Sequence, residues 1–446
     1  MITHARVLHR ASSLVGLGLM SMLSGCAASS SGASSGDASG RTMPPNCCLE
    51  AGLDIAERYR ASGIADRRFD RETLSRALAS ALRSPAILSE EIGRSIHGRP
   101  IHAMTFGEGA TSVLLWSQMH GDESTATMAL VDILLFLASA DDDPLRERLR
   151  SSLTITMVPM LNPDGAELFQ RENAMGIDIN RDARRLATPE ARALKSLRDR
   201  LEPDFGFNLH DQGARTLAGE GGRQVAIALL APAFDAERSY NDTRSRARLV
   251  AARIAEVLRS EIPGQVARYD DTFNPRAFGD LIQQWGTSTV LIESGAIEGD
   301  PEKQRLRALN VAAILTALDA IGTGSYARAD PDEYDRLPFN ERISADLLIT
   351  GASIVLDDGD PIRADLALTY DDAVARTGPR LRDVGDLTEV VALDTIQAAG
   401  LFVHPAREML TVREGKRWLQ IDEPAELEIR RGALAGSELV RRIGGK

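Results

Sequence analysis

Cysteine is scarce in this 446-residue chain, and basic residues are outnumbered by acidic ones. The only cysteines are Cys26, Cys47 and Cys48. Adjacent Cα atoms lie about 3.8 Å apart, which is below the usual span of a disulfide, so a bond between Cys47 and Cys48 would be strained and we predict no disulfide framework. Lysine and arginine together number 52 against 64 acidic residues, which gives a formal net charge of -12. Because that charge repels phosphate backbones, we expect no nucleic-acid partner.

The remaining composition is that of a soluble globular protein. Hydrophobic residues make up 43% of the chain and charged residues 26%, which argues against wholesale disorder and against a polytopic membrane protein. The length predicts more than one domain. We find no internal repeat, so repeat architectures are not expected.

The N-terminus has the layout of an export signal. Arg6 and Arg10 precede an apolar stretch that runs from Leu14 to Leu23. Such a basic region followed by a short apolar region is typical of a secretory signal. The apolar stretch is too short to span a membrane as a mature helix.

The signal ends in LSGC, which resembles the lipobox of bacterial lipoproteins, where Cys26 would receive a lipid. We therefore expect residues 1–26 to be a lipoprotein signal peptide and residues 27–48, rich in Ala, Ser and Gly, to be a flexible tether. A plain signal peptide with an incidental cysteine is the alternative. The expected location is the bacterial cell envelope, on the periplasmic side or at the outer membrane, with membrane contact through the N-terminal lipid only.

Residues 49–325 alternate between predicted strands and helices. Apolar runs bounded by turn residues predict strands at 101–107, 111–118, 153–160, 204–210 and 288–294. Amphipathic spacing predicts helices at 124–138, 189–201, 245–260 and 302–321, and a helical lead-in over 54–92. This order predicts an α/β fold with a mixed, mainly parallel sheet and helices on both of its faces.

The composition changes after Gly322. Residues 324–342 are rich in charge and contain two prolines, which is typical of a connection between domains. Beyond it, short apolar runs alternate with turn residues. We predict a small β-rich domain over residues 326–446, whose sequence indicates no particular role.

Ionisable side chains occur where two apolar strands are predicted to end. His120 and Glu123 lie in HGDE, directly after one strand, and His210 ends another. Sites in α/β proteins lie at the carboxyl ends of strands, and two imidazoles with one carboxylate form a catalytic zinc ligand set. We therefore predict one Zn²⁺ per chain, bound by His120, Glu123 and His210. The alternatives are a chance HxxE pattern and an ordinary buried histidine.

Glu293 lies at the end of the apolar strand VLIES. An ionisable group is costly in such a place unless it is paired or functional. The position therefore predicts either a functional carboxylate or a salt-bridged structural one.

Six motifs occur in the order GRSIHGRPI, SQMHGDE, PMLNPDGAE, GIDINRD, FNLHD and LIESG. Over roughly residues 90–321 this order resembles the zinc metallocarboxypeptidases, the carboxypeptidase A-like family. The resemblance implies a catalytic domain over 49–325 that hydrolyses C-terminal peptide bonds through a zinc-activated water. It implies that Glu293 is the general base, that Arg171 stabilises the oxyanion, and that Asn180 and Arg181 bind the free C-terminal carboxylate of a peptide substrate.

The sequence also departs from the family pattern. Asp122 stands between the first two ligands, where the family often has arginine, and Asp182 stands where a neutral residue is common. Tyr269 is the nearest match to the tyrosine that closes over the substrate, although it lies 24 residues before Glu293, a longer spacing than usual. In the same loop Arg276 and Asp280 are candidates for the side-chain pocket.

Two other functions remain open at this point. A zinc amidase or deacylase acting on cell-wall peptides would use the same ligands, and the expected envelope location puts peptidoglycan-derived substrates within reach. A catalytically silent, peptide-binding lipoprotein would keep the fold without turnover. The terminal residue that is cleaved, the oligomeric state and the role of the C-terminal domain are not indicated by the sequence.

Overall fold

The computed structural model describes residues 45–356 and 360–445. The predictions for Cys26, for the signal peptide and for most of the tether therefore lie outside the described residues. Among the described residues, no helix combines the length and the apolar composition needed to cross a bilayer.

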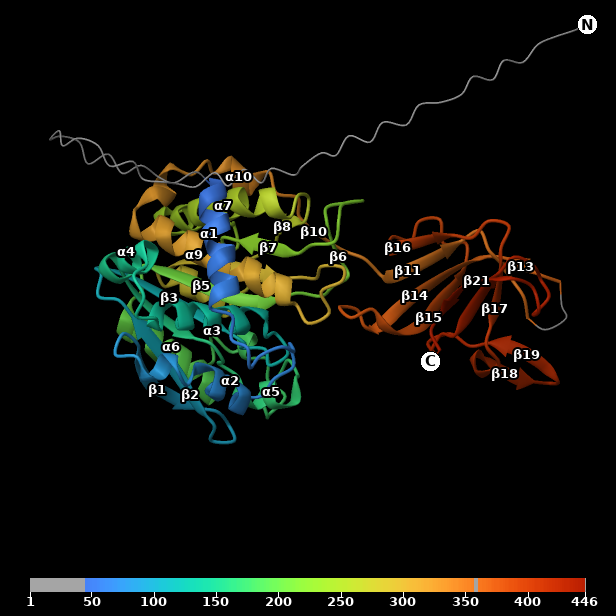
Figure 1. Ribbon diagram of the computed structural model, residues 1–446, viewed down its shortest axis with the longest axis horizontal. Coiled ribbons are helices and arrows are strands. Elements are labelled where there is room, and N and C mark those ends of the chain that lie inside the picture. Colours follow the sequence, from blue (N-terminus) through green and yellow to red (C-terminus); the bar gives the residue numbers. More distant parts are fainter. Residues whose placement is uncertain (1–44, 357–359, 446) are drawn as a thin grey trace, which may run out of the picture. The chain divides into compact units, whose positions relative to one another are not determined.

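An eight-stranded mixed sheet organises the first part of the chain, in the order β1-β2-β4-β3-β5-β9-β7-β8 (Figure 1). The central strands β4, β3, β5 and β9 are parallel, and β7 is parallel to β8. The pairs β1–β2, β2–β4 and β7–β9 are antiparallel. The mixed, mainly parallel sheet of the sequence prediction is thus present. The strands are β1 (Leu88–Arg94), β2 (Pro100–Phe106), β3 (Thr111–Ser117), β4 (Leu153–Val158), β5 (Phe205–Asp211), β7 (Ile227–Leu230), β8 (Val266–Arg268) and β9 (Ser288–Ser294).

Both faces of the sheet are covered because its central strands are apolar on both sides. In β3, Val113 and Leu115 join one buried cluster, while Leu114 and Trp116 join another on the opposite face. Helices α1, α3, α7 and α9 supply the first cluster, and α6 and α8 supply the second. The helices are α1 (Pro45–Arg58), α2 (Arg71–Leu78), α3 (Thr125–Ala138), α4 (Pro144–Ser152), α5 (Pro163–Leu168), α6 (Pro189–Leu201), α7 (Asp242–Glu261), α8 (Phe278–Gln284) and α9 (Gln304–Gly322).

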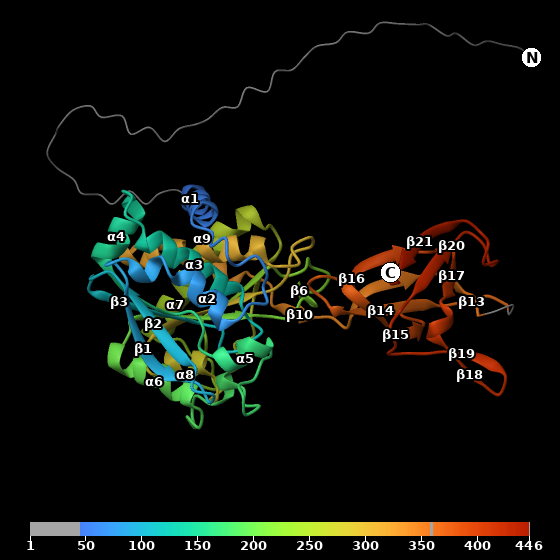
Figure 2. The same ribbon diagram turned by 60° about the horizontal axis from the view of Figure 1, so that its bottom comes forward.

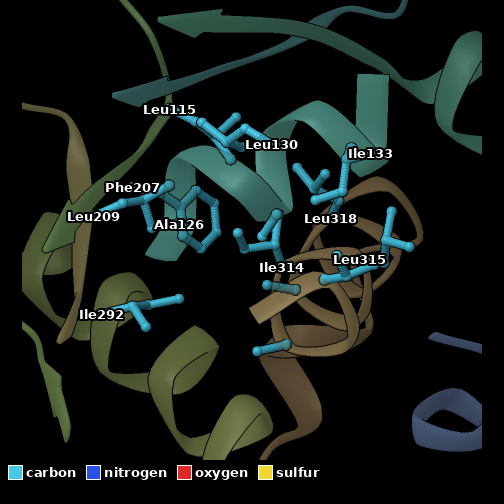
Figure 3. Packing of buried hydrophobic residues seen from close by; sticks show 14 of the residues in the cluster. Leu115, Ala126, Leu130, Ile133, Phe207, Leu209, Ile292, Ile314, Leu315 and Leu318 are labelled. Atoms are coloured by element: carbon cyan, nitrogen blue, oxygen red, sulfur yellow. The ribbon is translucent and has the colours of Figure 1, made fainter. Parts of the chain in front are cut away.

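The first cluster shows why α3 and α9 lie side by side. Leu130 and Ile133 of α3 pack with Ile314 and Leu318 of α9, beside Phe207 of the sheet (Figure 3). Almost every side chain of α3 is buried, as expected for a helix that is apolar all round. This packing fixes the start of α3, which directly follows the HGDE motif.

The helical lead-in predicted over 54–92 is confirmed only at the end of α1 and in α2, and it is wrong for the rest of that range. Helix α1 ends at Arg58, the short α2 follows, and residues 88–94 form β1, which pairs antiparallel with β2 at the edge of the sheet. Pairing with an exposed sheet edge is a tertiary interaction that outweighs a weak helical preference. The sequence prediction also missed α4, α5, α8, β7 and β8, which are short.

The C-terminal part is β-rich, as the sequence predicted, and contains two small sheets. One has the order β15-β14-β11-β16 and the other β13-β12-β17-β20-β21, and a buried cluster with members from both includes Leu347, Leu366, Val403 and Leu427. Their bounds are β11 (Ala345–Thr350), β12 (Ser353–Ile354), β13 (Ile362–Arg363), β14 (Asp365–Asp372), β15 (Thr377–Gly385), β16 (Ala392–Gln397), β17 (Phe402–Pro405), β20 (Leu427–Arg430) and β21 (Leu439–Ile443).

Two shorter pairings complete the strands. The hairpin β18 (Leu410–Arg413) and β19 (Lys416–Leu419) belongs to the C-terminal region, where both views show it beside the sheets (Figures 1 and 2). Strand β10 (Asn340–Arg342) pairs antiparallel with β6 (Thr216–Ala218). The second pairing joins the connection after α9 to the loop that follows the predicted ligand His210.

Candidate metal centre and active site

The predicted site residues lie at the carboxyl ends of three adjacent parallel strands. His120 follows β3, His210 lies in β5 and Glu293 lies in β9. Strands β3 and β5 are neighbours, and His210 pairs in register with Glu293 across β5 and β9. Register partners in a parallel pair point to the same face, so the topology brings these distant residues together.

The turn that carries His120 is held by the NPDG segment. A side chain on Gly121 would place its Cβ 2.0 Å from the carbonyl carbon of Gly165, so the two turns approach too closely for any residue larger than glycine. Asn162 caps α5 by accepting a hydrogen bond from the Gly165 amide and also donates to the Met119 carbonyl. NPDG is therefore more than a turn after a strand, because it supports the metal-ligand segment.

The three predicted ligands meet at one point. His120 Nδ1 lies 2.7 Å from Glu123 Oε1, and His210 Nδ1 lies 2.6 Å from Glu123 Oε2. One ligand atom from each of the three residues lies within 4.8 Å of the others, and all three residues are buried. Two imidazole nitrogens and one carboxylate oxygen form a donor set that fits zinc.

Asp178 orients His120, a role that the sequence analysis did not assign. Its Oδ1 lies 3.0 Å from His120 Nε2, the ring nitrogen opposite the one that faces Glu123. A carboxylate behind a ligand histidine fixes the tautomer and the ring orientation. Asp178 lies in the quoted motif GIDINRD, so the signal was present, but only the fold shows which histidine it contacts.

The electrostatics of the ligand cluster favour an ionised Glu123. Burial would raise the pKa of this carboxyl group, but the two adjacent imidazoles outweigh it and lower the pKa well below its usual range. The pKa of His120 shifts in the opposite direction. Burial would lower its pKa, whereas Glu123 and Asp178 raise it to about 9. Opposite charges on these neighbouring groups therefore stabilise each other in the metal-free cluster.

Glu293 has the opposite environment. It is buried at the end of β9, and burial first, then the charge of Glu123, raises its pKa well above the usual value. Among the described residues, no ion pair within 4.0 Å involves Glu293, so the structure does not support the salt-bridged alternative. A carboxyl group with a raised pKa in a cleft is a candidate for proton transfer near neutral pH.

Arg171 lies beside the predicted metal ligands. Its Nη1 is 3.1 Å from Glu123 Oε1, and its Nη2 donates to Asp178 Oδ2 over 2.9 Å. The guanidinium is 38% exposed, so one side remains open to the cleft. That geometry leaves a permanent positive charge available to a developing oxyanion.

Asn180 and Arg181 form a second polar group in the same cleft. Asn180 accepts a hydrogen bond from the Phe278 amide, and its Nδ2 lies 3.4 Å from His210 Nε2. The Arg181 guanidinium donates to the Asn180 carbonyl over 2.8 Å. The contact to Phe278 attaches this pair to the start of α8.

Tyr269, which follows β8, and Asp280, which lies in α8, both line the cavity. The charge of Glu293 first, then burial, raises the pKa of Tyr269, which places its hydroxyl near the predicted base. Burial raises the pKa of Asp280 to about 6. Arg276, by contrast, is exposed, does not line the cavity, and contacts the Arg181 carbonyl.

One cavity of about 830 Å³ is lined by nine of the residues described above: His120, Glu123, Arg171, Asn180, Arg181, His210, Tyr269, Asp280 and Glu293. Its wall also includes side chains that the sequence analysis did not single out. Phe169 closely follows the PMLNPDGAE motif, whereas the others lie outside the quoted motifs. These side chains are Arg67, Phe169, Lys303, Arg342, Ala373 and Val374.

Comparison with known proteins agrees with this geometry. Residues 78–215 match the family model described as zinc carboxypeptidase. An uncharacterized protein of Zymomonas mobilis is 30% identical over 131 residues, which cover 28% of this chain and 34% of that protein. Probable carboxypeptidase 2 of Arthroderma benhamiae is 28% identical over 159 residues, covering 35% and 29% of the two chains. The matches thus span about a third of these relatives.

Among solved structures, a metallo-carboxypeptidase from Burkholderia cenocepacia aligns with a TM-score of 0.45 and 22% identity, over 56% of this chain and 70% of that one. The family match contains His120, Glu123 and His210, whereas Glu293 lies beyond its end. Through residues 78–215, which are less than half of its length, the chain is similar to the zinc carboxypeptidase family.

Proposed function

We propose that this chain is a zinc-dependent carboxypeptidase that removes C-terminal residues from peptides. The proposal depends on the pairing of Glu293 with His210 in register between β9 and β5. This pairing puts a carboxyl group of raised pKa next to the three candidate ligands. Members of the family are peptidases, but this chain matches only part of its curated relatives. The activity of the whole protein is therefore a proposal.

Each side chain has a role in this proposal. His120, Glu123 and His210 would hold the ion, and zinc bound there would polarise the scissile carbonyl and lower the pKa of water to about 7. Glu293 accepts a proton from the attacking water and returns one to the leaving amine. Arg171 stabilises the negative charge that develops on the carbonyl oxygen.

The substrate is held by its free C-terminus. Arg181 offers a planar fork of donors that matches a carboxylate, and Asn180 adds an amide beside it. Tyr269 lines the same cavity as Glu293, where its hydroxyl can contact the terminal residue. A carboxylate anchor one residue away from the scissile bond would select the last peptide bond of the chain.

The first experiment is the substitution Glu293→Gln in the zinc-loaded protein. The amide cannot accept the proton, so we expect turnover of a mixed peptide library, read by mass spectrometry, to fall by about three to four orders of magnitude. Zinc content should stay at one ion per chain. Glu108→Gln, at a carboxyl that is 76% exposed, is the matched control. Full activity of Glu293→Gln with zinc bound would refute the assignment of the base.

A second experiment separates a carboxypeptidase from an amidase or deacylase. Peptides with a free C-terminus and the same peptides with a C-terminal amide are offered side by side. The carboxylate anchor predicts hydrolysis of the free form only, and cell-wall peptides can be tested in the same pair of forms. Equal cleavage of both forms would favour the deacylase function.

We also propose that Cys26 carries a lipid that anchors the protein in the bacterial cell envelope. The support is the export-signal layout and the LSGC sequence alone. Fractionation of cells that express the wild type or Cys26→Ala tests this proposal. Recovery of both proteins in the same membrane fraction would contradict it.

A further inference from the structure

The turn between β14 and β15 forms part of the wall of the active-site cavity. Ala373 and Val374 of this turn line the same cavity as His120, His210 and Glu293. The turn lies in the β-rich region, about 80 residues after Glu293 in the sequence and beyond the part of the chain that matches the zinc carboxypeptidase family. The cavity is therefore completed by a segment that the family match does not include.

Contacts on both flanks hold the turn in place. On one side, the Asp372 carboxylate forms an ion pair with the buried guanidinium of Arg67. On the other, Arg376 Nη1 lies 3.0 Å from Glu298 Oε1, in the loop that follows Glu293. Ion pairs to two separate loops fix the turn against the cavity better than one exposed pair would.

The turn is also ordered internally. Asp372 Oδ1 accepts hydrogen bonds from the Val374 amide at 3.1 Å and the Ala375 amide at 3.0 Å. An aspartate that bonds the backbone two and three residues ahead stabilises a tight turn. The position of Val374 therefore does not depend on a flexible loop.

Further contacts attach the neighbouring strands to the loop after His210. Arg215 Nε donates to Asp346 Oδ2 of β11 over 2.9 Å, and Arg215 Nη2 donates to the Tyr370 carbonyl of β14 over 2.7 Å. Asn340 Nδ2 donates to Gln212 Oε1 over 2.5 Å. The strand that leads into the turn is thus bonded to a loop that itself lines the cavity.

The proposed carboxylate anchor and the turn belong to different segments of the cavity wall. Asn180 contacts Phe278 and His210, whereas the ion pairs of the turn go to Arg67 and Glu298. A peptide whose C-terminal carboxylate is held at Arg181 has its preceding residues in the same cavity, whose wall also includes Ala373 and Val374.

We propose that the turn 373–376 is a specificity determinant that restricts the enzyme to short peptides. The inference rests on the proposed carboxypeptidase function. A cavity of about 830 Å³ falls in the range of sites for small molecules, about 300 to 1,000 Å³. A short peptide fits within it, whereas a longer chain must pass the apolar side chains of the turn and lose contact with water there.

The test compares binding of a tripeptide and a decapeptide that end in the same three residues. Binding is measured by calorimetry on the full chain, loaded with zinc, in the Glu293→Gln background so that no peptide is cleaved. We expect the tripeptide to bind about tenfold more tightly, which corresponds to about 1.4 kcal/mol. Replacing residues 373–376 by Asn-Gly, a favoured hairpin turn, should bring the ratio of the two dissociation constants close to one.

A single substitution in the turn tests the same proposal if the protein with the shortened turn does not fold. Val374→Trp narrows the mouth and should increase the ratio, whereas Val412→Trp, at an exposed position of the β18–β19 hairpin, should leave it at the wild-type value. A ratio that is the same in all four proteins overturns the proposal. If the ratios change as expected but the chain with Glu293 intact hydrolyses no peptide, the proposed chemistry fails and the length restriction stands.

Discussion

Replacing Asp280 by Asn should stabilise the protein at neutral pH and not in acid. Burial raises the pKa of this carboxyl group from 3.8 to about 6. The folded protein therefore binds the proton more tightly than the unfolded chain does. Ionisation of Asp280 costs stability as the pH rises from about 4 to above 6, and the cost is absent below the unfolded pKa.

The size of the effect follows from the two pKa values. The difference between 3.8 and about 6, at about 1.36 kcal/mol per pH unit, corresponds to about 3 kcal/mol at pH 7 and less than about 1 kcal/mol at pH 4. It is an upper bound, because Asp280 faces the water of the cavity. Asparagine keeps the acceptor for the Asn274 amide, which Asp280 binds at 2.8 Å, so the substitution removes the charge and retains the hydrogen bond.

Chemical unfolding of wild type and Asp280→Asn at several pH values between 4 and 8 measures this difference. The free energy of unfolding of the variant should exceed that of the wild type at pH 8, and the two should converge toward pH 4. A gain that does not depend on pH would point to packing, and the absence of any gain at pH 8 would refute the reasoning. Residues that line functional sites often lower the stability of the folded protein in this way.

Three further predictions concern the core, the ligand turn and the metal. Arg307 is bonded to Asp132 at 2.5 and 2.6 Å, so Arg307→Leu leaves a buried carboxylate without its cation. The free energy of unfolding, measured by chemical denaturation, should fall by about 3 to 5 kcal/mol. The double variant Asp132→Asn with Arg307→Leu should lose less. Gly121→Ala places a Cβ 2.0 Å from backbone and should abolish zinc binding in a metal-content assay even if the protein folds. Zinc at a thousand times its dissociation constant should stabilise the wild type by about 4 kcal/mol. The melting temperature should therefore rise when zinc is added and fall again when a chelator removes it. The melting temperature of His210→Ala should not respond to zinc.

The central strands and the convergence of the candidate ligands were predictable because they depend on local pattern. Strands buried on both faces are continuously apolar, and Leu114 and Trp116 lie on one face while Val113 and Leu115 lie on the other. HGDE follows such a strand directly, so the sequence alone places its side chains at a carboxyl end. The resemblance then supplied the order of the remaining motifs.

The parts that sequence analysis missed depend on contacts between distant segments. Strand β1 forms because it pairs with the edge strand β2. Its own sequence pattern predicts a helix. Val374 and Arg67 line the cavity although neither lies near a motif. Local periodicity does not predict that the turn between β14 and β15 contacts the loop before α2, because that contact depends on the whole fold.

Two buried glutamates of the site differ only in their neighbours. Glu123 lies between two imidazoles that lower its pKa, whereas Glu293 lies at the end of an apolar strand where burial raises its pKa and the charge of Glu123 raises it further. Environments that push two carboxyl pKa values apart separate the roles of the groups. Because Glu123 is itself a proposed ligand, a divalent cation bound to it would offset the negative charge that Glu293 experiences. The proton affinity of the proposed base is therefore coupled to occupancy of the metal site through one carboxylate.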